Sequence, residues 1–342
     1  MPARQSLCAS VLAALALLTA APSVSAEEVN LYSARQEALI KPLLDMFTAQ
    51  TKIAVNLVTG NEDALLKRLE SEGANSPADL LLTSDAGRLF RAKAAGLTQS
   101  FASPAIEAAV PSQYRDPEGH WVGLSLRARP ILYVTGKVDP KSLSTYEDLA
   151  DPKWKKRICI RSSNSIYNQS LVASMIAVHG VDKAEAWAKG LVANLAIPPK
   201  GGDRDQIKAA AAGQCDIVVA NTYYLVGMVT SQDEGQIAAA RKMAVFWPNQ
   251  DGRGVHVNVS GAALTKAARH KAAAIKLVEF LAAPESQAWY AEANGEYPVR
   301  AGVGEGAVLK AWGSFKADQL NLAKLGEHNA AAVKLMDRAG WK

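Results

Sequence analysis

The chain has 342 residues and a mass of 36.3 kDa, which is more than one hydrophobic core usually supports, so we expect two domains or two lobes. With 49% hydrophobic and 21% charged residues, the composition is that of a globular protein and excludes disordered, collagen-like, coiled-coil and disulfide-dense chains. The formal net charge of +5 comes from 38 basic and 33 acidic residues without a long basic run. This diffuse charge argues against a nucleic-acid-binding groove.

Residues 1–26 predict a secretory signal peptide that is removed from the mature protein. The segment carries one early charge, Arg4, then an apolar run through Leu18 and the small residues Val24, Ser25 and Ala26. The apolar run is shorter than the roughly 20 residues of a membrane-spanning helix, and an A-x-A-like cleavage site follows it. We therefore expect cleavage after Ala26 and export to the periplasm.

Two cysteines remain after the predicted cleavage, in a compartment where disulfides persist. Cys159 and Cys215 each lie in a strand-like run, at residues 157–160 and 215–219. Because the two runs are candidates for neighbouring strands of one sheet, we expect one disulfide between them. Two buried free thiols are the alternative.

Strands and amphipathic helices alternate along the chain in the pattern of an α/β protein with mostly parallel sheets. Residues 29–32 predict a strand, Ser33 a helix cap, and Leu39, Leu43, Leu44 and Phe47 the buried side of the next helix. The following elements are a strand at 53–58, a helix beginning at 65–69 and a strand at 78–83 that is buried on both faces.

Residues 121–134 and 243–260 are strand-like runs too long for one ordinary strand, and each contains a proline that can mark a bend. We interpret both as hinge strands that cross between two lobes. The predicted N-terminal lobe comprises residues 27–128 and 254–305, and the C-terminal lobe comprises residues 129–253 and 306–342.

Known catalytic patterns are missing from the sequence. It contains no P-loop, G-x-G-x-x-G, H-E-x-x-H or G-x-S-x-G motif, and its five histidines lack metal-ligand spacing. We therefore expect a binding protein and not an enzyme.

Two segments place tyrosines directly after a predicted strand. Residues 216–220 predict a buried strand, after which Thr222 is a candidate cap for a helix that starts with Tyr223 and Tyr224. Neighbouring residues in a first helical turn are about 100° apart, so both phenols can converge in front of the helix N-terminus. The segment 161–170 has the same form and carries Tyr167 in its first turn. Half-buried packing is the alternative role for these tyrosines.

Five segments in this order resemble the periplasmic ferric-iron-binding proteins of ABC importers. They are NLYSARQ at 30–36, PADLLLT at 77–83, GLSLRAR at 123–129, residues 161–170 and NTYY at 221–224. The resemblance covers essentially the whole mature chain. It implies a type II periplasmic-binding-protein fold, similar to bacterial transferrins, in which two α/β lobes close on one Fe³⁺.

By position, the resemblance assigns the iron ligands to the phenolates of Tyr167, Tyr223 and Tyr224. Fe³⁺ prefers anionic oxygen donors, and a phenol with a pKa near 10 must lose its proton to bind, so metal and proton compete. Three phenolates neutralise the ion, and a small anion such as carbonate then suits the remaining coordination positions.

The sequence departs from part of this family at the first strand-to-helix turn. Many members have a histidine there, sometimes followed by a tyrosine, where this chain has Gln36 and Glu37; some also have a carboxylate ligand at the position of Ser84. We therefore expect fewer protein ligands, with an anion in the coordination positions that the missing ligands leave open. Arg35, Gln36 and Arg127 are the candidate anion-binding residues, since arginine presents a planar fork of donors, and Glu37 is a weaker candidate ligand.

The predicted function is therefore capture of ferric iron, free or chelated, by a monomer that delivers it to an ABC permease. A periplasmic receptor for a thiamine-like or polyamine solute is the alternative within the fold, although its site would need aromatic faces and carboxylates. A secreted hydrolase is the alternative from another class, and it would need a nucleophile and a base.

Overall fold

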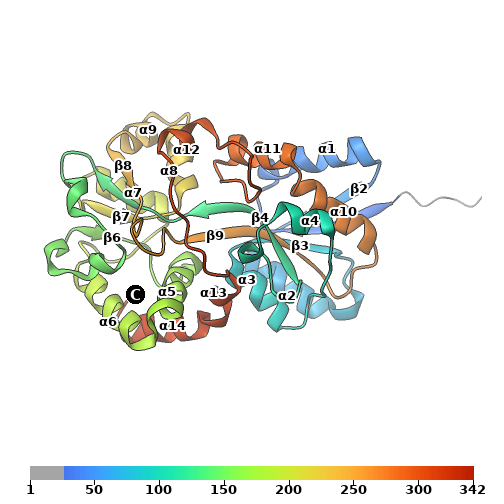
Figure 1. The fold of residues 1–342 in the computed structure, drawn as a ribbon, viewed down its shortest axis with the longest axis horizontal. Coiled ribbons are helices and arrows are strands. Elements are labelled where there is room, and N and C mark those ends of the chain that lie inside the picture. The colour runs from blue at the N-terminus through green and yellow to red at the C-terminus, as the bar shows by residue number, and fades with distance from the viewer. Residues whose placement is uncertain (1–26) are drawn as a thin grey trace, which may run out of the picture.

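The computed structural model describes residues 27–342, so the predicted signal peptide lies outside the described residues. Two α/β lobes lie next to each other along the long axis of the molecule, each built around one β-sheet (Figure 1). The first sheet has the order β2-β1-β3-β9-β4, and the second has the order β6-β7-β5-β8. The predicted two-lobed α/β fold is confirmed.

Helices cover the sheets of both lobes, as the alternating pattern predicts. The first lobe contains β1 Glu28–Ser33, η1 Glu37–Leu39, α1 Lys41–Thr51, β2 Ala54–Thr59, α2 Glu62–Glu72, β3 Leu80–Ser84, α3 Ala86–Ala94, α4 Pro104–Ala109, β4 Trp121–Ala128, β9 Val257–Leu264, α10 Lys271–Leu281 and α11 Pro284–Asn294. The second lobe contains β5 Ile131–Val134, β6 Ile158–Cys159, α5 Ile166–His179, α6 Val181–Ala193, α7 Asp203–Ala211, β7 Ile217–Val219, α8 Thr222–Val229, α9 Glu234–Ala240 and β8 Met243–Phe246.

The turn after β1 differs from the predicted one. Ser33 does not cap a helix: it ends β1, and its hydroxyl accepts a hydrogen bond from the backbone N–H of Arg35. The short helix η1 intervenes, and α1 starts only at Lys41 with Pro42 in its first turn, where the missing N–H of proline costs nothing. The predicted buried side of α1 is otherwise present, except that Leu39 is only half-buried.

The chain passes between the lobes through the two predicted hinge strands. β4 ends before Arg129 and Pro130, and β5 continues the same run in the second sheet; β8 ends before Pro248, and β9 begins the return. β5 and β9, the strands by which the chain enters each sheet from the other lobe, run antiparallel to their neighbours. The remaining strands of each sheet share one direction, as expected.

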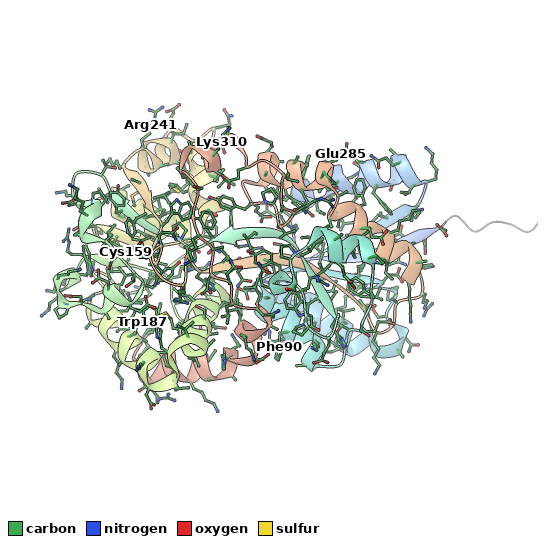
Figure 2. All side chains as sticks on the ribbon, viewed as in Figure 1. Phe90, Cys159, Trp187, Arg241, Glu285 and Lys310 are labelled. Carbon is green, nitrogen blue, oxygen red and sulfur yellow. A yellow bond between two sulfur atoms is a disulfide. The ribbon has the colours of Figure 1, made fainter. Side chains whose placement is uncertain are left out.

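After α11 the chain returns to the second lobe through three short helices, α12 Ala307–Ala311, α13 Ala323–Glu327 and α14 Asn329–Arg338. α13 packs against both α3 of the first lobe and α5 of the second. Gly326 permits this close approach, because a Cβ at that position would lie only 2.2 Å from the side chain of Phe90 and would clash with it. Figure 2 labels Phe90 near this contact. α13 therefore ties the lobes together outside the hinge.

The predicted disulfide is confirmed between Cys159 and Cys215, which lie in the second lobe (Cys159 in Figure 2). Cys159 ends β6, whereas Cys215 lies two residues before the parallel neighbour β7 and not within a strand as predicted, so the bridge joins the end of β6 to the loop before β7. The bridge closes a segment with a sequence separation of 56 residues that contains α5, α6 and α7.

We predict that reduction of this disulfide lowers the free energy of unfolding by about 4 kcal/mol. The unfolded chain gains conformational entropy when a cross-link that closes a loop of this length is removed. Urea denaturation with and without dithiothreitol measures the change. The Cys159→Ala, Cys215→Ala double variant serves as the control and should not respond to the reductant. Equal urea midpoints for the oxidised and reduced parent protein would contradict the prediction.

Candidate metal centre

Tyr223 and Tyr224 occupy the first turn of α8, directly after the buried strand β7. Asn221, and not Thr222, stands at the N-cap position of this helix. The two rings lie with their centroids 4.3 Å apart and are tilted by 39°. The predicted arrangement, in which both rings lie together at a helix N-terminus, is present in the structure.

Tyr167 comes to the same place from another helix. It is the second residue of α5, whose N-cap residue is Ser165. Its phenol acts electrostatically on both Tyr223 and Tyr224, raising the pKa of each. Contacts also connect the helix starts, since Arg161 faces the ring of Tyr167 and donates to Asp203, which is joined through Arg129 to the N-cap residue Asn221 of α8. We call the three tyrosines the tyrosine cluster.

The surroundings of Tyr223 and Tyr224 hold both phenols in the protonated form. Burial, followed by the nearby phenol of Tyr167 and the carboxylate of Asp203, raises the pKa of Tyr224 to about 12. Burial and the other two phenols raise the pKa of Tyr223 well above its usual value. A multiply charged cation among them would reverse this preference, because it favours the phenolate forms.

Arginines face the rings of all three tyrosines. The guanidinium carbon lies 5.5 Å from the ring centroid for Arg127 over Tyr223, 5.6 Å for Arg161 over Tyr167 and 5.5 Å for Arg204 over Tyr224. These cations oppose the effect of burial, since Arg127 lowers the pKa of Tyr223 and Arg161 that of Tyr224. Because Arg127 belongs to β4 of the first lobe, the cluster lies where the two lobes meet.

Of the predicted anion-binding residues, Arg127 lies closest to the tyrosines. Its side chain is buried and donates a hydrogen bond to the hydroxyl of Ser260 on β9. Burial alone would lower the pKa of Arg127, but Glu296 and the phenols of Tyr223 and Tyr167 raise it. The guanidinium therefore remains charged beside the cluster.

The other predicted residues are placed differently. Arg35 is buried and donates from Nη2 to the carboxylate of Glu296 at 2.5 Å and to the hydroxyl of Ser125 at 2.9 Å. Gln36 and Glu37 are exposed at the start of η1. Within residues 27–342, no hydrogen bond or ion pair joins either of them to the tyrosine cluster.

Glu296 is a buried acidic residue that the sequence analysis missed. It follows α11 and lies between two cations, because both Arg35 and Arg127 act on its carboxylate. Burial works to raise the pKa of Glu296, but these arginines and the hydrogen bonds from Arg35 and Ser125 hold it below the usual value. No local motif marks this residue, since its partners are far away in the sequence.

A second missed group lies beneath the tyrosine cluster. The guanidinium of Arg129, from the first hinge strand, donates to Asp203, Asn221 and Asn168 at distances of 2.6 to 3.1 Å. Asp203 also accepts a hydrogen bond from Arg161 at 3.0 Å. The only sequence signals are the position of Arg129 before the hinge proline and that of Asp203 after two glycines.

The position at which some family members carry a carboxylate ligand is occupied by half-buried Ser84, which donates to Glu62 at 3.2 Å. The next residue, Asp85, has a φ of 81° and accepts hydrogen bonds from Ser170 on α5 and Asn258 on β9. Asp85 therefore links the two lobes close to the helix that carries Tyr167.

A groove of about 410 Å³ opens beside Tyr223. Arg204 and Gly227 line it from the second lobe, and Leu39 and Ala291 line it from the first.

Across residues 27–342, no group of three or more histidines, cysteines, aspartates or glutamates is placed to hold a metal ion. None of the helices in the same range is long and apolar enough to cross a membrane.

Comparison with known proteins identifies relatives along the whole described chain. Residues 75–316 match the family described as bacterial extracellular solute-binding protein. Iron uptake protein A1 of Synechocystis sp. is 50% identical over 316 residues, which cover 92% of this chain and 88% of the relative. The major ferric iron-binding protein of Neisseria meningitidis serogroup B is 28% identical, covering 97% of this chain and 98% of the relative.

Comparison with solved structures also identifies relatives of this chain. A Trichodesmium protein, IdiA or FutA in complex with iron and citrate ligands, is 52% identical and superposes with a TM-score of 0.90, covering 92% of this chain and 100% of that chain. The fold is accordingly that of type II periplasmic binding proteins. The chain belongs to the bacterial extracellular solute-binding proteins and is homologous to iron uptake protein A and the ferric-iron-binding proteins.

Proposed function

We propose that this protein captures Fe³⁺ in the periplasm through the phenolates of Tyr167, Tyr223 and Tyr224 and delivers it to the membrane permease of an ABC importer. The observation that carries the proposal is the tyrosine cluster itself. Three phenols from two helix starts lie together where the lobes meet, and an arginine faces each ring. The names of the relatives, which refer to iron uptake and ferric iron binding, support the same ligand.

The chemistry of the donor set suits a trivalent cation. Phenolate oxygens are anionic and hard, and three of them balance the charge of Fe³⁺. The raised pKa of Tyr223 and of Tyr224 means that the phenols give up protons only to a strongly charged competitor. A neutral or monocationic organic solute gains little from such a cluster.

A small anion, carbonate or a similar one, completes the coordination in this proposal. Arg127 is its main partner, because it is buried and lies over Tyr223. Arg35 supports the same pocket through Glu296, which both arginines contact electrostatically. Gln36 and Glu37 are exposed, so each must turn inward to act as an anion donor or as an additional ligand.

The two lobes contribute different parts of the site. The phenols come from the second lobe, whereas Arg127 comes from the first. Iron with its anion therefore binds better when the lobes are together, and a ligand with this preference shifts the population toward the closed state. A monomer with a closed, loaded form is sufficient for delivery to a permease and requires no catalytic step.

The experiment that tests the function is the visible spectrum of the purified mature protein after addition of ferric citrate. An orange-red phenolate-to-iron charge-transfer band is expected. In the Tyr223→Phe, Tyr224→Phe double variant the band should disappear. Affinity should fall by more than the ~10–100-fold that loss of an outer hydrogen-bond partner costs. Tyr133→Phe, in β5 of the same lobe, is the matched control and should bind like the parent.

We predict that iron binding depends on bicarbonate or a substitute anion and that Arg127 is responsible. In bicarbonate-free, chelator-free buffer the parent protein should lose affinity, and Arg127→Gln should show low affinity with or without bicarbonate. Arg88→Gln is the control, because Arg88 pairs with Glu62 and not with the tyrosines. Isothermal titration with and without bicarbonate measures both effects. Identical titrations of the parent and Arg127→Gln would show that protein ligands complete the shell.

We predict that ferric affinity falls steeply on acidification. The pKa of Tyr224 is about 12 and that of Tyr223 is also raised, so these phenols are protonated below pH 8 and each must release a proton to bind iron. Two released protons imply a loss of up to about 10² in affinity per pH unit. Competition against a chelator of known protonation constants measures the slope. Tyr224→Phe should give a slope smaller by about one proton, and an unchanged slope would exclude its phenolate as a ligand.

A further inference from the structure

We propose that Arg129 is a positioning residue of the metal centre: its buried guanidinium holds the starts of α5, α7 and α8, and with them the tyrosine cluster, in a fixed relation to the hinge. The inference extends the proposed function, on which its iron-binding test rests. Its structural test needs no iron.

The backbone of Arg129 lies where the two hinge strands meet. Its N–H donates to the carbonyl of His256 at 3.0 Å, on the opposite hinge strand. Its carbonyl accepts a hydrogen bond from the hydroxyl of Tyr146 at 2.6 Å. The same hydroxyl accepts from the N–H of His256 at 3.1 Å. These three contacts fix residue 129 at the pivot between the lobes.

The side chain of Arg129 reaches from this pivot to three helix starts. Nη1 donates to Asp203, the first residue of α7, at 3.1 Å and to Asn221, the N-cap of α8, at 3.0 Å. Nη2 donates to Asn168, in the first turn of α5, at 2.6 Å. The side chain is 1% exposed and that of Asp203 is 0% exposed, so water does not compete for these contacts.

Each acceptor either lies next to a tyrosine or contacts a residue that faces one. Asn168 is the neighbour of Tyr167 and also donates to the carbonyls of residues 161 and 162, which fixes the loop before α5. The amide of Asn221 lies 3.4 Å from the hydroxyl of Tyr223. Asp203 binds Arg161, whose guanidinium faces the ring of Tyr167. A shift of Arg129 therefore changes the relative position of the phenols.

Arginine suits this position for a geometric reason. Its planar group presents several N–H donors in fixed directions, whereas a lysine has one nitrogen that cannot serve three acceptors on different helices with the same geometry. Lysine keeps the positive charge beside Asp203, so Arg129→Lys removes the geometry while keeping the sign of the charge. This substitution separates positioning from simple charge balance.

Arg157 provides a matched control in the same lobe. It also makes an ion pair, with Asp216 at 2.7 Å, but its side chain is 34% exposed and its hydrogen bonds to Asp216 and Lys137 lie at the strand end opposite the helix starts that carry the tyrosines. Arg157→Lys therefore tests the general effect of an arginine-to-lysine change in this lobe.

The first test is hydrogen–deuterium exchange on the iron-free protein. We expect Arg129→Lys to speed exchange in the first turns of α5, α7 and α8 together, and Arg157→Lys to leave these turns unchanged. Exchange at the parent rate in all three turns of Arg129→Lys would overturn the inference. If that variant does not fold, Asn168→Ala removes one acceptor and should speed exchange in α5 alone; no change there would overturn it equally.

The second test is a ferric titration followed by the charge-transfer band. We expect Arg129→Lys to bind iron roughly 10–100-fold more weakly, with a shifted band, as for other partners that orient metal ligands. Arg157→Lys should match the parent. Parent-like affinity and band in Arg129→Lys would contradict the inference. If the parent itself shows no band, the proposed iron site fails, while the exchange data still decide the role of Arg129.

Discussion

The ion pair between Arg129 and Asp203 is the interaction on which the rest of the site depends. Both side chains are buried, and charges removed from water are costly unless their remaining donors and acceptors are satisfied. Here Asn168, Asn221 and Arg161 provide those additional contacts. Because Asn168 and Asn221 lie at the starts of the helices that carry the tyrosines, the contacts that satisfy this buried pair also hold the tyrosine cluster. Removal of one partner from such a pair costs about 3–5 kcal/mol in stability.

Two opposing electrostatic effects meet in the tyrosine cluster. Burial and mutual repulsion of the phenolates favour protonated phenols, whereas the surrounding arginines favour the phenolates. For Tyr224 the balance lies with the protonated form, since its pKa stays at about 12 despite Arg161. A site balanced in this way responds to the charge of its surroundings, because a nearby cation favours the phenolate form and a nearby anion favours the phenol.

The fold accounts for the division of the site between the lobes. The first hinge strand carries Arg127 and Arg129 two residues apart at its end, yet Arg127 faces Tyr223 and Arg129 reaches the helix starts beneath the cluster. Residues of one short segment thus contact both the tyrosine cluster and the helix starts beneath it. The contact between α13 and both lobes, and the hydrogen bond from Ser170 to Asp85, add further connections across the interface.

The sequence by itself determined the features that depend on local patterns. These are the two α/β lobes, the hinge strands broken at Pro130 and Pro248, the disulfide between Cys159 and Cys215, and Tyr167, Tyr223 and Tyr224 at helix starts. Only the tertiary structure decided which charged groups meet. Arg35 contacts Glu296, which is 261 residues away in the sequence, and Arg129 contacts Asp203, which is 74 residues away. Gln36 and Glu37 are exposed because η1 precedes α1. Such pairings depend on how distant elements pack, and no periodicity in hydrophobicity or spacing encodes them.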